Sequence, residues 1–158
     1  MLNATEILVF VIETQRFAVR LEQVVRAVAA VEVTPLPGAP AVVLGLFDLQ
    51  GVMVPVYDAS LRFGAPSASA AVSTPVRASE QFLVLRSGRG LAALRVQQTL
   101  GVQPLNDLQA LPADTQDAGP HWFDGVTRMA DGLVLIHDID HFLSSAEARQ
   151  LGEALESM

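Results

Sequence analysis

The segment 45–64, GLFDLQGVMVPVYDASLRFG, constrains the fold of this chain more than any other part. Two apolar runs with the composition of β-strands meet there at Gln50 and Gly51. Pro55 lies within the second run, and because proline has no N–H to donate, we expect that strand to have one unpaired edge. Unpaired strand edges can dock partner chains. The segment contains no acid–base pair, thiol or metal-ligand spacing, so it indicates a binding module.

Composition narrows the class of protein. The chain has 158 residues, enough for one domain or for one compact unit built from two small subdomains. The net charge is -7, and the acidic residues are concentrated after residue 100, which argues against nucleic acid as a partner. Cysteine is absent, so disulfides and thiolate metal sites are excluded, and this suits a reducing compartment.

The first residues carry no targeting signal. Glu6 and Glu13 surround a six-residue apolar run, and no basic segment precedes it. We therefore expect neither a signal peptide nor direct insertion into a membrane, and we expect a cytoplasmic protein.

Short apolar runs separated by glycine and proline predict a β protein, because runs of about five residues are typical of small barrels. A short helical turn is expected from Leu21, since Leu21, Val24, Val25 and Val28 recur at helical spacing. Ser144 and Glu147 form a capping-box pattern that predicts a helix over about 145–156. Strands are expected over residues 7–13, 17–19, 29–33, 42–49, 52–57, 82–85, 91–96, 123–128 and 133–137.

The remaining segments are predicted to be irregular. Residues 35–40 are broken by proline and glycine, and residues 87–90 form a glycine-rich hairpin turn. Residues 65–79 are small, polar and low in complexity, so we expect a surface loop joining two halves of the chain. Residues 103–120 are expected to be irregular, and Asp131 with Gly132 is expected to form a turn.

One cluster of side chains could hold a metal ion. His137 and His141 are four residues apart, with Asp138 and Asp140 beside them, which resembles a two-histidine metal arrangement on a helix. No glutamate lies between the histidines, however, and the start of a helix explains the same acidic residues. A metal-dependent small-molecule enzyme or binding protein centred on His137 and His141 is therefore kept only as an alternative.

Other features give no support for catalysis. Asp48 and Asp58 would lie roughly 15 Å apart at opposite ends of two extended strands, at about 3.3 Å per residue, so we expect turn and cap roles. Nucleophile-elbow, P-loop, dinucleotide-binding and HExxH motifs are absent. Trp122 and Phe123, beside His121, could form an exposed aromatic patch, but aromatic residues next to a strand are more often in the core, and we expect them there. We predict no enzyme, no cofactor and no metal.

The order of the motifs is more specific than any one of them. A hairpin ends at Phe17-Ala18-Val19, residues 24–27 follow, and a loop is formed by Leu36-Pro37-Gly38-Ala39-Pro40 before segment 45–58. Residues 91–96, 123–126 and 132–136 continue the series in the second half. In this order and spacing the motifs resemble the CheW family of chemotaxis coupling proteins, over about residues 6–155.

The resemblance implies an all-β fold of two packed five-stranded SH3-like β-barrels, with a short helix in the first half and a C-terminal helix. A single CheW-like domain would span 1–158, with intertwined subdomains at roughly 15–64 and 80–137 that terminal segments complete. It implies a non-catalytic adaptor that couples the cytoplasmic tip of methyl-accepting receptors to the regulatory domain of a CheA-type histidine kinase. Such an adaptor would be cytoplasmic and would join chemotaxis, surface-sensing or pilus-linked receptor arrays through its partners.

Transfer from the family, residue by residue, predicts a partner-binding site. The chain departs from the family pattern here, since Gln50 replaces an arginine, Arg26 replaces an acidic residue, and Gln97 replaces an aspartate. These changes suit a divergent adaptor. A third interpretation is an architectural relative that associates with itself through its barrels and binds no kinase. The residues expected to contact partners are Val24, Arg26, Gln50, Gly51, Val52 and Pro55.

Overall fold

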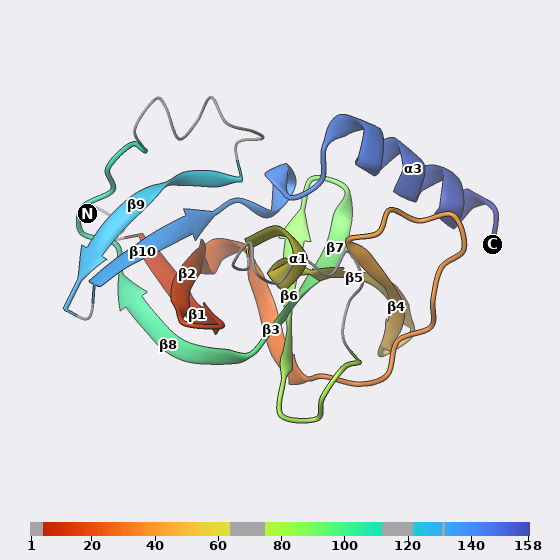
Figure 1. Ribbon diagram of the computed structural model, residues 1–158, viewed down its shortest axis with the longest axis horizontal. Helices are drawn as coiled ribbons and strands as arrows, with labels where there is room; N and C mark the ends of the chain where they lie inside the picture. The colour runs from red at the N-terminus through yellow and green to blue at the C-terminus, as the bar shows by residue number, and fades with distance from the viewer. Residues whose placement is uncertain (1–4, 64–74, 112–121, 131) are drawn as a thin grey trace.

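The computed structural model describes residues 5–63, 75–111, 122–130 and 132–158. The strands in these residues form two five-stranded sheets that lie side by side (Figure 1). Sheet A has the order β8-β1-β2-β10-β9, and its strands are β1 (Glu6–Ile12), β2 (Gln15–Arg20), β8 (Gln98–Pro104), β9 (Phe123–Met129) and β10 (Gly132–His137). Sheet B has the order β3-β6-β7-β5-β4, and its strands are β3 (Val24–Ala29), β4 (Val43–Leu49), β5 (Val52–Asp58), β6 (Gln81–Ser87) and β7 (Gly90–Val96).

Short helices connect and cover the sheets. The 3-10 turns η1 (Leu21–Gln23) and η2 (Ile139–His141) follow β2 and β10, and α1 (Ala59–Phe63) follows β5. The longest helix, α3 (Ser145–Glu156), packs Ala148, Leu151 and Ala154 inward. The predicted mostly-β architecture with a C-terminal helix is confirmed. The short helix expected from Leu21 is the 3-10 turn η1, and α1 was not predicted.

Both faces of β1, β6 and β7 are buried, which explains their continuous apolar runs in the sequence. Along β1, Leu8 and Phe10 enter a cluster that also holds residues of sheet B, whereas Ile7 and Val9 enter a cluster formed by sheet A. Sheet B has its own cluster around Phe47 and other residues of its strands. The protein therefore has one core between the sheets and one core within each sheet.

The two halves of the chain exchange hairpins. Strands β1 and β2 pair with β8 to β10, whereas β6 and β7 pair with β3 to β5. The pairing pattern is the same in both sheets, because β10 runs parallel to β2 and β5 runs parallel to β7. The two sheets can be aligned by placing the parallel pair Val56–Ala93 on the parallel pair Ile136–Ala18. In this alignment Met53 corresponds to Leu133, Asp58 to Asp138, and Arg95 to Arg20. Each sheet therefore contains strands from both halves.

A glycine permits each sheet to curl. Thr34, beyond β3, forms a bridge with Leu46 of β4, and Gln109, beyond β8, forms a bridge with Val126 of β9. Gly45 precedes Leu46, and a Cβ on Gly45 would lie 2.3 Å from the carbonyl oxygen of Thr34. Gly125 precedes Val126, and a Cβ on Gly125 would lie 2.5 Å from the carbonyl oxygen of Gln109. Only glycine leaves room for these close approaches.

Three local predictions need correction. The strand expected at residues 29–33 is wrong for residues 30–33, because β3 spans Val24–Ala29: the apolar residues that recur at helical spacing form this edge strand, and only Leu21–Gln23 is helical. Strand β8 was not predicted, because the composition of residues 98–104 is mixed and half exposed. The unpaired edge expected for β5 is present along only part of the strand, because β5 lies between β4 and β7 and its edge toward β7 is unpaired before Val56. Its pairs with β7 begin only at Val56, one residue beyond Pro55, so the missing N–H of proline costs no ladder bond.

The other predicted strands agree in position with the structure to within a few residues, including the hairpin around residues 87–90. The subdomain ranges 15–64 and 80–137 do not coincide with the sheets, because each sheet draws strands from both ranges. Residues 64–74, most of the expected surface loop, lie outside the described residues, as do Asp131 of the expected turn and residues 112–120 of the expected irregular segment.

Candidate partner-binding surface

The turn between β4 and β5 is exposed, and its backbone conformation is stabilised by local contacts. Gln50 has a φ of 52° and Gly51 a φ of 93°, the two consecutive positive values that a tight hairpin with the twist of its strands requires. The carboxylate of Asp48 accepts a hydrogen bond of 2.6 Å from the N–H of Gly51. Asp48 therefore has the turn role expected from the sequence, and Gly51 is required by the backbone.

Two large apolar side chains lie next to this turn. Val52 is 50% exposed and Met53 is 48% exposed, although both belong to a strand whose later residues are buried. Val52 is among the predicted contact residues and Met53 is not; two consecutive apolar residues immediately after a hairpin turn are the signal that could have identified Met53. We call Gln50, Gly51, Val52 and Met53 the tip surface.

The other predicted contact residues lie elsewhere. Arg26 is exposed on β3, an edge strand of sheet B, and Val24 is half-buried against the core between the sheets. Strand β3 and the β4–β5 hairpin occupy opposite ends of the strand order. Pro55 is buried opposite Leu46. The six residues therefore comprise two residues of an edge strand, three residues at the exposed tip and one interior proline.

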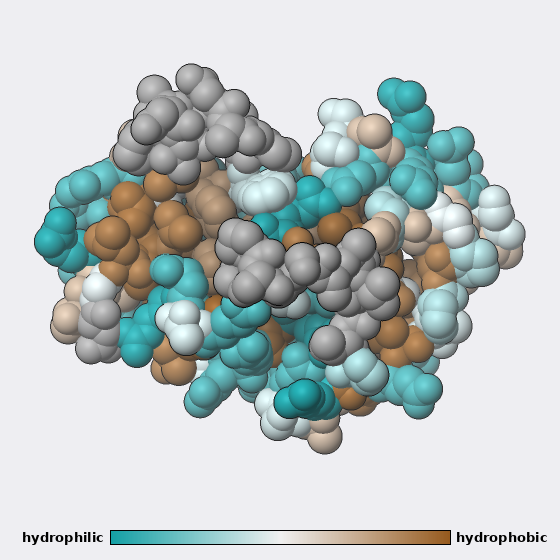
Figure 2. Space-filling model, in the orientation of Figure 1, coloured by the Kyte–Doolittle hydropathy of each residue, from teal (hydrophilic) through white to brown (hydrophobic). Residues whose placement is uncertain are grey.

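The equivalent hairpin of sheet A has a similar exposed tip. Leu133, the match of Met53, is 55% exposed at the start of β10. Figure 2 shows apolar atoms gathered at this end of the molecule, around the β9–β10 hairpin. Exposed apolar groups on protein surfaces often mark contacts with other proteins.

A buried ion network supports sheet B. Arg95 is 5% exposed and its guanidinium donates to Glu80 at 2.9 and 3.0 Å and to Asp58 at 3.4 Å. Asp58 also accepts hydrogen bonds from the N–H and hydroxyl of Ser60. Asp58 therefore caps the start of α1, as expected from the sequence. Asp48 and Asp58 have different hydrogen-bond partners and do not form a carboxylate pair.

The two histidines of the alternative metal site do not come together. His137 is fully buried, its Nδ1–H donates to the carbonyl of Trp122, and its ring lies 4.8 Å from that of Phe63. Burial lowers the pKa of His137 from 6.5 to about 4. His141 lies exposed on η2 beside Asp138. The alternative based on His137 and His141 is wrong, because one ring belongs to the core and the other faces solvent.

A different set of polar side chains comes together near His141. Ligand atoms of Asp124, Asp138 and His141 lie within 4.8 Å of one another. Arg20 already contacts Asp124 at 3.5 Å, and Asp138 accepts hydrogen bonds from Gln23 and from the N–H of Asp140. These contacts satisfy the carboxylates as parts of an exposed polar network.

Arg62 fastens the C-terminal helix to the body of the protein. Its guanidinium contacts Glu147 of α3 at 2.6 Å and stacks 5.1 Å from the ring centre of Trp122. Burial by itself would raise the pKa of Glu147, but hydrogen bonds from Ser144 and Arg62 outweigh it, so the pKa is lowered.

Within the described residues, no helix has the length and apolar character needed to cross a membrane.

The comparison with known families decides the classification. A family model described as a CheW-like domain matches residues 6–147. The chain belongs to the CheW-like domain family. The resemblance expected from the motif order is confirmed.

Relatives cover nearly all of this CheW-like chain. The chemotaxis protein CheW of Rhizobium meliloti (strain 1021) is 28% identical over 142 residues, which are 90% of this chain and 89% of that protein. The chemotaxis protein CheW of Treponema pallidum (strain Nichols) is 24% identical over 153 residues, with coverages of 92% and 86%. The crystal structure of the scaffolding protein TtCheW from Thermoanaerobacter tengcongensis has a TM-score of 0.76 at 19% identity, covering 93% of this chain and 92% of that one. This structural match confirms the predicted fold class.

Proposed function

We propose that this chain is a non-catalytic adaptor that couples methyl-accepting chemoreceptors to a CheA-type histidine kinase in a chemosensory array. Membership of the CheW-like family is the observation that carries the proposal, and it is supported by relatives described as chemotaxis and scaffolding proteins. The adaptor acts on the cytoplasmic side of the receptor array and reaches the membrane only through its partners.

The tip surface is the proposed contact with the kinase regulatory domain. It combines an exposed apolar pair, Val52 and Met53, with a rigid turn at Gln50 and Gly51. A preordered turn loses little conformational freedom on binding, so burial of the apolar pair stabilises the complex efficiently. Arg26 and Val24 on the edge strand form a second proposed contact, for the receptor tip.

Substitution of Met53 tests the kinase contact directly. We expect Met53→Asp to weaken binding of the CheA-type regulatory domain from the same genome by about tenfold or more, because a carboxylate would be desolvated at the contact. Isothermal titration calorimetry with purified proteins measures the affinity.

The matched control is Leu133→Asp, which places the same charge at the equivalent, equally exposed position of sheet A. We expect it to retain the affinity for the regulatory domain. Equal affinities for wild type and Met53→Asp would remove the tip surface from the proposal. Failure of wild-type protein to bind either the kinase domain or a receptor-tip fragment would contradict the adaptor function.

A further inference from the structure

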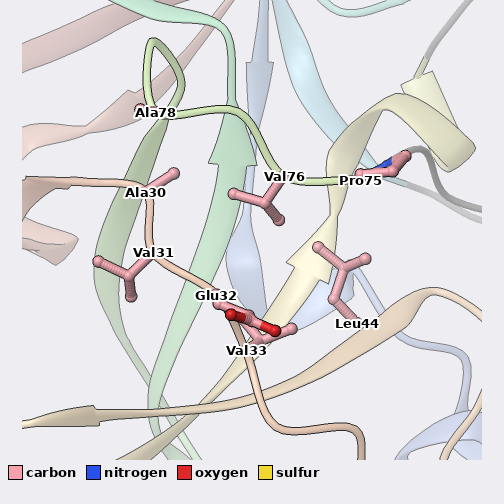
Figure 3. Close-up of a pocket in the computed structure, with 8 residues that line it drawn as sticks. All are labelled: Ala30, Val31, Glu32, Val33, Leu44, Pro75, Val76 and Ala78. Carbon is pink, nitrogen blue, oxygen red and sulfur yellow. The ribbon is translucent and has the colours of Figure 1, made fainter.

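A groove of about 520 Å³ opens on sheet B beside the segment that leaves β3. Residues 30–33 form one wall and residues 75–78 the other, and Leu44 of β4 points across the groove toward Val76 (Figure 3). This volume lies within the range of roughly 300–1,000 Å³ that is usual for ligand sites. The groove is separate from the tip surface, with which it shares no residue.

The backbone along one wall is available for pairing. The N–H of Ala30 donates to the carbonyl of Glu80 at 3.0 Å, and Thr34 exchanges two bonds of 2.8 Å with Leu46. Between these anchors, the backbone groups of residues 31–33 have no hydrogen-bond partner in the part of the chain that the structure describes. Free donors and acceptors beside an apolar groove are the features by which a sheet accepts an added strand.

The groove has one charged lining residue, Glu32. Its side chain is exposed and forms no hydrogen bond or ion pair in the described residues. Of the charged residues nearby, Arg95 is engaged by Glu80 and Asp58, and Arg77 lies between Val76 and Ala78 without lining the groove. The remaining side chains of the lining are apolar. Charge complementarity therefore favours an occupant that carries apolar side chains and a basic residue.

Both walls are held in place before any partner binds. Arg95 donates at 2.9 Å to the carbonyl of Pro75, so the buried network that supports sheet B also fixes the far wall. The N–H of Arg77 donates to the carboxylate of Glu80 at 2.7 Å. A preformed groove reduces the entropy that is lost on binding, so a short segment can bind it.

We propose that the groove lined by Val31, Glu32, Val33, Leu44, Pro75 and Val76 binds an extended segment of a partner protein that carries apolar side chains and a basic residue. The segment pairs with the free backbone of residues 31–33, places an apolar side chain between Leu44 and Val76, and pairs its cation with Glu32. This site supplies the adaptor with a contact independent of the tip surface.

The test selects random ten-residue peptides displayed on phage against the immobilised full chain. We expect the enriched peptides to combine Arg or Lys with Val, Ile or Leu. The most enriched peptide is then synthesised, and its affinity is measured by fluorescence anisotropy for wild type and variants. We expect Glu32→Gln to weaken binding about threefold to fivefold, as for an exposed ion pair, and Val76→Lys to abolish it by placing a cation in the groove.

Glu22→Gln is the matched control, because Glu22 is an exposed glutamate on η1, away from the groove. We expect it to bind the peptide as wild type does. Unfolding curves of each variant verify the fold. Absence of enriched peptides, or equal binding by wild type, Glu32→Gln and folded Val76→Lys, would overturn the groove site. Retained binding of the kinase domain in that case leaves the adaptor function standing.

Discussion

His137 shows how one buried residue makes stability depend on pH. The ring is enclosed by aromatic side chains, and its Nε2 has no hydrogen-bond partner among the residues that the structure describes. Because its pKa is about 4 in the folded protein and 6.5 in the unfolded chain, the unfolded chain binds the proton first as the pH falls. Neutral His137 is thus compatible with the fold above 6.5, and the folded state loses stability as the pH decreases from 6.5 toward 4.

We expect this residue to lower the free energy of unfolding by about 3 kcal/mol over that interval. Urea unfolding of wild type and His137→Leu at pH 7 and pH 4 measures the difference between the two pH dependences. His141→Gln, which changes an exposed histidine, is expected to retain the wild-type dependence. A wild-type dependence in His137→Leu would show that other groups cause the acid sensitivity.

Gly45 is required by packing of the backbone rather than by its position in a turn. Its φ is 150°, and a Cβ would lie 2.3 Å from the carbonyl oxygen of Thr34. We expect Gly45→Ala to reduce the free energy of unfolding by about 2 kcal/mol or more, because the bridge between Thr34 and Leu46 must open. Urea denaturation measures this change.

Gly152 provides the opposite case. It lies within α3, and a Cβ there meets no atom within 4 Å. We expect Gly152→Ala to raise the free energy of unfolding by up to about 1 kcal/mol, because alanine has the higher helix propensity. The steric explanation for Gly45 would fail if both alanine variants changed stability equally.

At the scale of elements, α3 is the part that local sequence describes best. The side chain of Ser144 accepts from the N–H of Glu147 at 3.1 Å, and Glu147 accepts from the N–H of Ser144 at 2.9 Å, so the predicted capping box is present. These contacts span only three residues, which is why the sequence pattern identifies both the start and the cap. The helix occupies residues 145–156, as predicted.

We expect Ser144→Ala to destabilise the protein by about 1 kcal/mol, because one backbone N–H at the start of α3 loses its partner. Thermal unfolding at neutral pH measures the effect. Ser145→Ala, at the exposed neighbouring position, is the control and is expected to leave the melting temperature nearly unchanged. Equal shifts for the two variants would mean that the cap contributes little.

Strand β3 illustrates the limit of local patterns. Val24, Val25 and Val28 recur at a spacing that fits one face of a helix, yet they belong to an edge strand that pairs with β6. The pairing depends on residues about sixty positions later in the chain, so no local period can report it. The predicted contact residues Val24 and Arg26 lie on this strand, so their position at the edge of sheet B was not predictable either.

At the scale of the whole molecule, the exchange of hairpins makes the two halves interdependent. Strands β1 and β2 complete a sheet whose other strands all come from residues after 97, and β6 and β7 complete the other sheet. A fragment of either half leaves apolar faces and strand edges unpartnered. Neither half can therefore bury its own core.

We expect fragments 1–63 and 75–158 to be unfolded when separate and to form the native sheets when mixed. Circular dichroism and a cooperative urea transition monitor folding, and calorimetry measures the association. The intact chain at the same concentration is the reference. A cooperative transition in either isolated fragment would contradict the interdependence of the halves.

The sequence by itself determined what local forces control: the β class, the positions of most strands, the hairpin turn at Gln50 and Gly51, and the capped C-terminal helix. Motif order added the family. Tertiary structure decided how strands from both halves combine, which of the predicted contact residues remain exposed, and that His137 is a core residue. The physical reason is distance along the chain. The period of apolar side chains and the chemistry of turns act over a few residues, whereas sheet pairing and burial join residues that can lie more than a hundred positions apart.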